Sequence, residues 1–143
     1  MRVNVDEAVR ILNEGGNVAI PTETVYGLAA LYHHSSAIDR IFKLKGRPRD
    51  NPLIIHVADQ QSVEALASPL PKSFFALVEA FWPGPLALAL EVDQNKVLDS
   101  VRARLPKACF RMPAHPLALE VIQRSGPLVM PSANLSGKPS PTD

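Results

Sequence analysis

The sequence contains one cysteine, Cys109, among its 143 residues. A single cysteine excludes an internal disulfide bond and a zinc site built from several thiolates. No apolar run is long enough to cross a bilayer, and Asp6 and Glu7 interrupt the region where a secretory signal peptide would be apolar. We therefore expect a cytoplasmic protein with no membrane contact, in which Cys109 is a buried structural thiol rather than a nucleophile.

Several nucleotide-binding and catalytic motifs are also missing. The sequence has no G-x-x-x-x-G-K-[ST] loop, since a proline follows Gly137-Lys138. It has no G-x-G-x-x-G fingerprint, no G-x-S-x-G elbow, and no His, Cys and Asp cluster with zinc spacing. If the protein binds ATP, it does so with arginine, lysine and serine on loops. We expect no metal ion held by protein side chains alone.

The charge and composition are those of an ordinary globular domain. Lys and Arg number 15 and Asp and Glu 14, so the net charge of +1 does not draw the protein to nucleic acid or an anionic membrane. The hydrophobic content of 46% is too high for a disordered chain. At this length we expect a single domain over residues 1–143, built around one core.

Short apolar segments alternate along the chain with segments of helical spacing. Asn4 can cap a first helix, which Gly15-Gly16 ends. Further helices are expected at 35–45, 62–67, 72–81 and 116–124, and strands at 18–20, 53–57, 86–90, 108–111 and 128–130. This alternation predicts an α/β fold with a mixed sheet.

The segment 21–27 follows the first expected strand and is rich in hydroxyl side chains. If the chain stays extended there, Thr22, Thr24 and Tyr26 point to one side and Glu23 to the other. A row of hydroxyls at a strand end is a common place for a ligand in an open α/β sheet. The alternative is a polar turn whose threonines bond to their own backbone. The residues alone do not decide between the two.

Four cations, Lys43, Lys45, Arg47 and Arg49, cluster at the end of the second expected helix and in the loop beyond Gly46. Lysines at a helix C-terminus complement its dipole. The arginines continue past that end, where their forked guanidinium groups could hold phosphate. A solvated basic face is the other explanation, and in general the more common one.

Two single residues and one loop are further candidates. His56 shares a strand face with Ile54 and Ala58, which favours a hydrogen-bonded core histidine over an imidazole that contacts a ligand. Arg111 ends a strand, where it can hold a carboxylate with two hydrogen bonds, cap a helix or pair with a surface acid. The stretch 131–140 is dense in serine and amide groups, which suits contacts to phosphate or ribose unless it is a plain turn-rich loop.

Taken together and in order, these segments resemble the YrdC/TsaC family of threonylcarbamoyl-AMP synthases. Each motif alone is weak, but six in sequence are specific, and they span nearly the whole chain. The matching segments are 21–28, the Lys45-Gly46-Arg47-Pro48 element with 50–54, His56, 82–86, 111–116 and 131–137. Family members usually continue with more sheet beyond the serine-rich loop, so this chain is expected to lack the C-terminal part of the family fold.

The resemblance implies a single YrdC-like domain: a twisted mixed sheet of parallel and antiparallel strands, helices packed around it, and a concave, positively charged cavity. It assigns L-threonine to Thr24, His56 and Arg111, with Arg111 on the carboxylate. Lys45 and Arg47 would be the catalytic residues, because they offset the repulsion between two anionic reactants. The implied ATP contacts are Lys45, Arg47, Asn51, the Met130 backbone, Ser132 and Ser140.

The implied activity is nucleotidyl transfer, which forms L-threonylcarbamoyl-AMP and pyrophosphate from ATP, L-threonine and bicarbonate, with Mg²⁺ bound to ATP. The product serves N6-threonylcarbamoyladenosine (t6A) modification at position 37 of ANN-decoding tRNAs. The resemblance therefore also implies a downstream threonylcarbamoyl-transferase, and weak RNA or tRNA binding is a further expectation. Two alternatives stay open: an RNA-binding YrdC-like module without synthase activity, and a carbamoyltransferase domain that uses carbamoyl phosphate.

Overall fold

The computed structural model describes residues 4–23, 26–46, 48 and 51–131. Within these ranges the helices are α1 Val5–Asn13, α2 Ser35–Lys45, α3 Gln60–Leu66, α4 Lys72–Phe81, α5 Asp99–Arg102 and α6 Pro116–Ser125. The strands are β1 Val18–Pro21, β2 Tyr26–Leu31, β3 Ile54–His56, β4 Leu88–Glu91, β5 Lys107–Arg111 and β6 Leu128–Met130.

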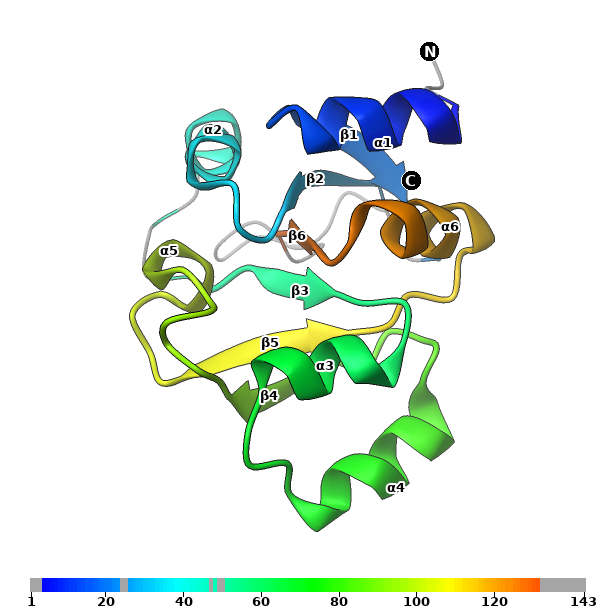
Figure 1. Ribbon diagram of the computed structural model, residues 1–143, viewed down its shortest axis with the longest axis vertical. Coiled ribbons are helices and arrows are strands. Elements are labelled where there is room, and N and C mark those ends of the chain that lie inside the picture. The colour runs from blue at the N-terminus through cyan, green and yellow to red at the C-terminus, as the bar shows by residue number, and fades with distance from the viewer. Residues whose placement is uncertain (1–3, 24–25, 47, 49–50, 132–143) are drawn as a thin grey trace.

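The six strands form one mixed sheet in the order β1-β2-β6-β3-β5-β4 (Figure 1). Strands β3 and β5 are parallel, whereas the other neighbours are antiparallel. The predicted α/β class and mixed sheet are therefore confirmed. None of the helices in the described ranges is long and apolar enough to cross a membrane.

Three predicted helix ends are confirmed: the start of α1, the end of α2 and the start of α6. The Asn4 side chain accepts a hydrogen bond of 2.8 Å from the Glu7 backbone N–H, which satisfies a free donor of the first turn of α1. Gly46 ends α2 in the left-handed conformation, with φ of 59°, which costs glycine little. Pro116 is the first residue of α6.

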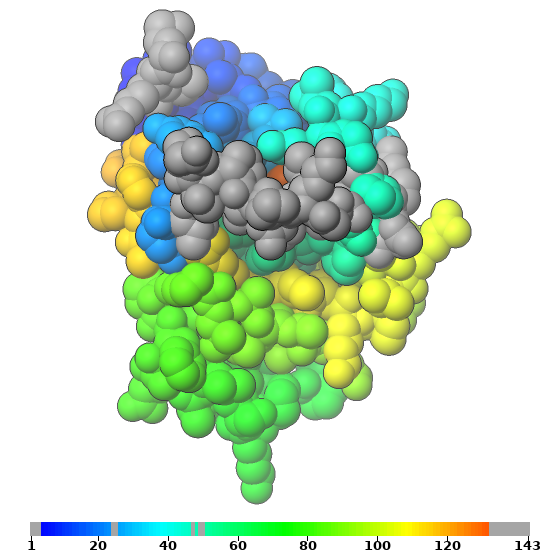
Figure 2. All heavy atoms as spheres, turned by 180° about the vertical axis from the view of Figure 1, so that it is seen from behind, coloured from blue at the N-terminus to red at the C-terminus, as the bar shows by residue number. Residues whose placement is uncertain are grey.

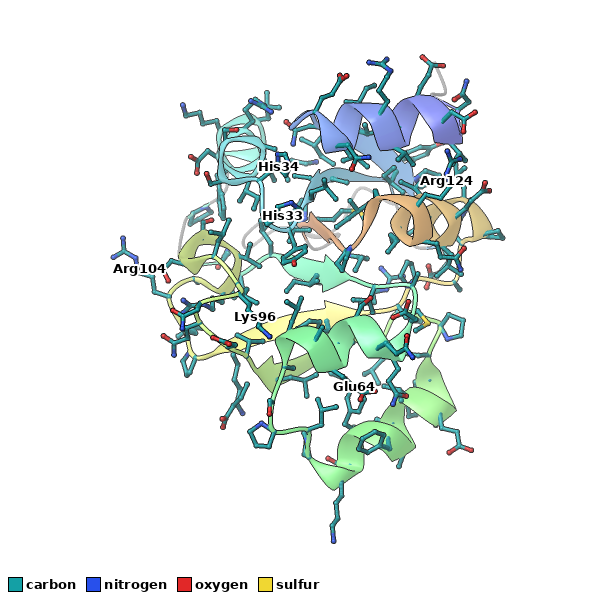
Figure 3. The ribbon with its side chains drawn as sticks, viewed as in Figure 1. His33, His34, Glu64, Lys96, Arg104 and Arg124 are labelled. Carbon is teal, nitrogen blue, oxygen red and sulfur yellow. The ribbon has the colours of Figure 1, made fainter. Side chains whose placement is uncertain are left out.

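Two apolar clusters lie on opposite faces of the sheet. One face contributes Ile55, Phe110 and Val129, which pack with side chains of α2, α3, α4 and α5. The other contributes Ile20, Ala29, Leu128 and Met130, which pack with α1 and α6. Arg124 on α6, labelled in Figure 3, also reaches Asp6 on α1 at 2.7 Å. The clusters together replace the single core expected from chain length.

Three features of the structure were not predicted from the sequence. The sequence did not predict β2 or α5. Strands β1 and β2 pair antiparallel with Pro21 opposite Tyr26, so the condition of an extended chain over 21–27 is not met. Cys109 is half-buried rather than buried, although burial still raises the pKa of its thiol.

Gly27 shows how closely β2 approaches its neighbour β6. A Cβ added at Gly27 would lie 2.5 Å from Sδ and 3.3 Å from Cβ of Met130. We therefore expect Gly27→Ala to lower the free energy of unfolding by about 1–2 kcal/mol, because Met130 must leave its packed position. Urea denaturation measures this loss.

The double variant Gly27→Ala/Met130→Ala tests the cause. If Met130 is the obstacle, the double variant loses less stability than the sum of the two single variants. Additive losses, or a Gly27→Ala protein as stable as wild type, would contradict the packing explanation.

Candidate functional site

His56 and Arg111 lie side by side where two parallel strands end. Residues His56 of β3 and Arg111 of β5 are register partners, so their side chains leave the same face of the sheet. Only 2% of His56 and 7% of Arg111 is exposed. The structure thus brings together two of the three residues assigned to threonine, at the carboxyl ends of strands where ligands of α/β sheets commonly bind.

The Arg111 guanidinium is held by two chain segments that are distant in sequence. Its Nε donates a hydrogen bond of 2.9 Å to the backbone carbonyl of Gly84, between α4 and β4. Its Nη2 lies 2.5 Å from Glu23 Oε2, just after β1. Glu23 Oε1 accepts a hydrogen bond of 3.0 Å from the Ala114 N–H, just before α6. Of the three roles considered for this arginine, the structure shows pairing with an acid.

The ion pair does not use all of the hydrogen-bonding capacity of Arg111. Despite its short distance to Glu23, Nη2 is buried and has no acceptor in hydrogen-bonding alignment among the described residues. The short separation balances the charge, whereas the alignment that a hydrogen bond requires is not met. A buried donor in this state costs free energy. An oxygen of a bound anion could remove that cost.

Glu23 is ionised near neutral pH. Partial burial alone would raise the pKa of its carboxyl group. Short contacts with its own backbone N–H, with the Arg111 guanidinium and with the Ala114 N–H outweigh that effect, together with the positive charge of Arg111, and lower the pKa below its ordinary value. The pair Glu23–Arg111 is therefore a carboxylate and a guanidinium with no net charge.

His56 is neutral near neutral pH. Burial lowers the pKa of its imidazole to about 4, and the positive charge of Arg111 adds to the effect. The Nδ1 atom lies 3.0 Å from the Ile54 carbonyl oxygen. Because a carbonyl oxygen can only accept, Nδ1 carries the proton, and Nε2 of the neutral ring is an acceptor. The ring is buried and hydrogen-bonded, and its contact with a ligand stays a prediction.

The sheet face beside this pair is partly open. Ile54 and Cys109, which lie on the face of His56 and Arg111, are half-buried, and Ala89 beside Cys109 is exposed. On the opposite face Ile55 and Phe110 have no exposed surface. Figure 2 views the molecule from behind, where green residues of α4 lie below blue residues of the β1–β2 region. A ligand on the open face would meet the end of β5.

The residues assigned to ATP lie elsewhere along β3. Met130 is buried and pairs with Ile54, at the amino end of β3, and the half-buried Asn51 precedes that end. Lys45 is exposed in the last turn of α2. The register thus separates Asn51 and Met130 from His56 along one short strand. The assigned residues that lie outside the described ranges are Thr24, Arg47, Ser132 and Ser140.

The predicted positively charged cavity stays a prediction. A cavity of about 430 Å³ in the described part of the chain is lined by Gln60, Phe75, Val78, Glu79, Trp82 and Met112, none of which is a cation. The described ranges contain no group of three His, Cys, Asp or Glu side chains that could hold a metal ion.

Sequence reasoning missed two parts of this site. Glu23 was expected only to point away from the neighbouring hydroxyls, and Gly84 was noted only within a motif. No local pattern predicts that Glu23 and Gly84 contact Arg111, because these contacts join residues far apart in sequence. Gly84 and Arg111 are 27 residues apart, and Glu23 and its second partner Ala114 are 91 apart. A carboxylate in the same polar motif was the one available hint.

The buried His56 gives a pH-dependent stability. Its folded pKa of about 4 lies below the ordinary 6.5, so the unfolded chain binds the proton first as the pH falls. Wild type therefore loses up to about 3 kcal/mol of unfolding free energy between pH 6.5 and pH 4 through this group. In His56→Gln this loss is absent, so urea denaturation should show a flatter pH profile for the variant. Parallel profiles would contradict the assignment.

Comparison with known proteins places the chain in a family. The model of the Sua5/YciO/YrdC family, described as telomere recombination, matches residues 10–143. A threonylcarbamoyl-AMP synthase of Bacillus subtilis (strain 168) is 48% identical over 139 residues, which is 96% of this chain and 40% of the relative. One of Pyrococcus abyssi (strain GE5 / Orsay) is 49% identical over 137 residues, 94% of this chain and 40% of the relative.

A solved structure agrees in sequence and in fold. The crystal structure of P. abyssi Sua5 complexed with L-threonine is 46% identical to this chain, with a TM-score of 0.88. The match covers 99% of this chain and 43% of that one. The chain spans about 40% of the length of these two curated relatives. Since the family model matches nearly all of its residues, the chain belongs to the Sua5/YciO/YrdC family.

Proposed function

We propose that this chain carries the threonine- and ATP-binding site of a threonylcarbamoyl-AMP synthase. The observation that carries the proposal is the pair at the ends of β3 and β5: Arg111, with a buried and incompletely bonded Nη2, beside the neutral His56. Two further findings support it: the two curated relatives are threonylcarbamoyl-AMP synthases, and the similar P. abyssi protein was crystallised in complex with L-threonine.

The two side chains offer complementary contacts to an amino acid. Arg111 presents donors to a carboxylate, and a charge-assisted bond to a guanidinium is among the stronger hydrogen bonds in proteins. Nε2 of His56 presents an acceptor, which suits a hydroxyl or an ammonium group. Thr24 is the third proposed contact to L-threonine. A small zwitterion that bears a hydroxyl meets these requirements.

ATP would bind toward the other end of β3. We assign its contacts to Lys45, Arg47, Asn51, the Met130 backbone, Ser132 and Ser140. Lys45 and Arg47 would neutralise the phosphate chain. Mg²⁺ enters as part of the nucleotide substrate, because phosphate oxygens are among its preferred ligands.

The reaction needs no strong base from the protein in its second step. The amine of threonine captures carbon dioxide derived from bicarbonate, with loss of water, and gives a carbamate anion. A carbamate oxygen then attacks the α-phosphorus of ATP, the bond to the β-phosphate oxygen breaks, and pyrophosphate leaves. The chain's contribution is to hold two anions in contact and offset their repulsion. That is the catalytic role proposed for Lys45 and Arg47.

The wider biological role follows from the product. We propose that a downstream threonylcarbamoyl-transferase uses it for t6A formation at position 37 of ANN-decoding tRNAs, and that the protein acts in the cytoplasm. Weak RNA binding stays a prediction. So do the two alternative functions, which the assay below separates.

The first test measures pyrophosphate release. Incubation with ATP, Mg²⁺, bicarbonate and L-threonine should release pyrophosphate, and omission of threonine should abolish the release. Equal release with serine or without an amino acid would contradict the proposal. Activity with carbamoyl phosphate in place of threonine would favour the carbamoyltransferase, whereas salt-sensitive RNA binding without pyrophosphate release would favour the RNA-binding module.

The second test separates the two substrate groups by calorimetry. Lys45→Ala and Arg47→Ala should each weaken ATP binding about tenfold and leave threonine binding within about twofold. Lys43→Ala is the matched control, since Lys43 is exposed in the same last turn of α2. Arg111→Ala should do the reverse. Equal losses for both ligands in every variant would undo the assignment.

A further inference from the structure

Three segments of the chain meet at Glu23. Its two carboxylate oxygens contact different partners, the Arg111 guanidinium at 2.5 Å and the Ala114 N–H at 3.0 Å. Arg111 in turn bonds to the Gly84 carbonyl at 2.9 Å. The end of β1, the loop before β4 and the loop before α6 are thereby fastened to the end of β5.

The contacts with Gly84 and Glu23 hold only one edge of the planar Arg111 guanidinium. Nε and Nη2 form the edge that faces Gly84 and Glu23. A guanidinium has five N–H donors in a planar fork, so holding this edge also fixes the direction in which Nη1 and the second hydrogen of Nη2 point. The side chain of Arg111 is 9% exposed, so few other orientations are open to it.

The Glu23 carboxylate balances the charge of Arg111 without giving Nη2 an aligned acceptor. A buried guanidinium without a counter-charge would be costly, and Glu23 supplies that charge. Nη2 nevertheless stays without an aligned acceptor. The arginine is therefore oriented and neutralised, yet it still has a donor for an incoming oxygen. An acceptor fully aligned with Nη2 would instead compete with a ligand for this donor.

We propose that Glu23 is a positioning residue for amino-acid binding: it orients Arg111 toward the ligand carboxylate. The inference rests on the proposed function, in which Arg111 and Thr24 contact L-threonine. It deepens that function, because it places the specificity for an α-carboxylate in a triad of Glu23, Arg111 and the Gly84 carbonyl rather than in the arginine alone.

The test compares Glu23→Gln with wild type by threonine titration and steady-state kinetics. Glutamine keeps an oxygen that can accept from Ala114, but it removes the charge that holds Arg111. We expect the threonine Kd and KM to rise about tenfold, with ATP affinity and kcat changed by less than about twofold. Unchanged threonine binding by Glu23→Gln would overturn the proposal. Tighter binding would also overturn it, because Glu23 would then compete with the ligand for Arg111.

Asp99→Asn is the matched control, because it removes the acidic partner of another buried arginine, Arg102. Asp99 Oδ1 lies 2.5 Å from Nη2 of Arg102, which is as buried as Arg111 but belongs to α5. If the effect of Glu23→Gln were general destabilisation, Asp99→Asn would raise the threonine KM equally. We expect no change beyond about twofold, and an equal rise would overturn the positioning role.

A spectroscopic measurement keeps the proposal separate from the proposed function. The Arg111 Nε–H, bonded to Gly84, should give a slowly exchanging ¹⁵N signal that Arg111→Lys removes. Glu23→Gln should speed its exchange at least tenfold, and unchanged exchange would overturn the orientation of Arg111 by Glu23. A different outcome is also possible: exchange is accelerated in Glu23→Gln as expected, but wild type binds no L-threonine. That result would overturn the proposed function and the ligand assigned to this triad, and would leave only the orientation of Arg111 by Glu23.

Discussion

The arrangement of this site depends on one buried positive charge. A guanidinium at the end of β5, withdrawn from water, requires a counter-charge and acceptors, and both must come from other segments. Glu23 and the Gly84 carbonyl meet that requirement. The same charge also lowers the pKa of the neighbouring imidazole of His56, which burial had already lowered. The site is thus a fixed cation beside a neutral acceptor rather than two cations.

The period of the strands determines which residues reach the site. Side chains alternate between faces, so within β3 and β5 the apolar residues Ile55 and Phe110 enter the core while His56 and Arg111 leave the other face. The helices α1 and α6 cover that other face only around β1, β2 and β6. The half-buried Ile54 and Cys109 mark where this cover stops. In the described ranges, the helices therefore leave the sheet surface next to the polar strand end only partly covered.

Local signals in the sequence predicted most elements but not the contacts between them. Caps such as Asn4 and stops such as Gly46 act within one turn, so α1 and α2 could be located from sequence. Strand β2 was missed because glycine and alanine, which are poor strand formers, make up half of Tyr26–Leu31, and its pairing with β1 and β6 stabilises it instead. The Glu23–Arg111 pair depends on the sheet order, which no local pattern encodes. The roles of Thr24 and Arg47 came from family resemblance alone.

The length of β3 sets the scale of the proposed reaction. Ile54, beside Met130, and His56, beside Arg111, are two residues apart, which corresponds to about 7 Å along a strand. A threonine held by its carboxylate at one end extends its carbamate toward a nucleotide at the other, and reacting atoms must approach to about 3–3.5 Å. One short strand therefore suffices to place both anions in contact. The Glu23–Arg111 pair carries no net charge. The positive charge that offsets the repulsion between the two anions must therefore come from the nucleotide side. The family resemblance assigns the proposed catalytic cations, Lys45 and Arg47, to ATP, and this charge balance agrees with that assignment.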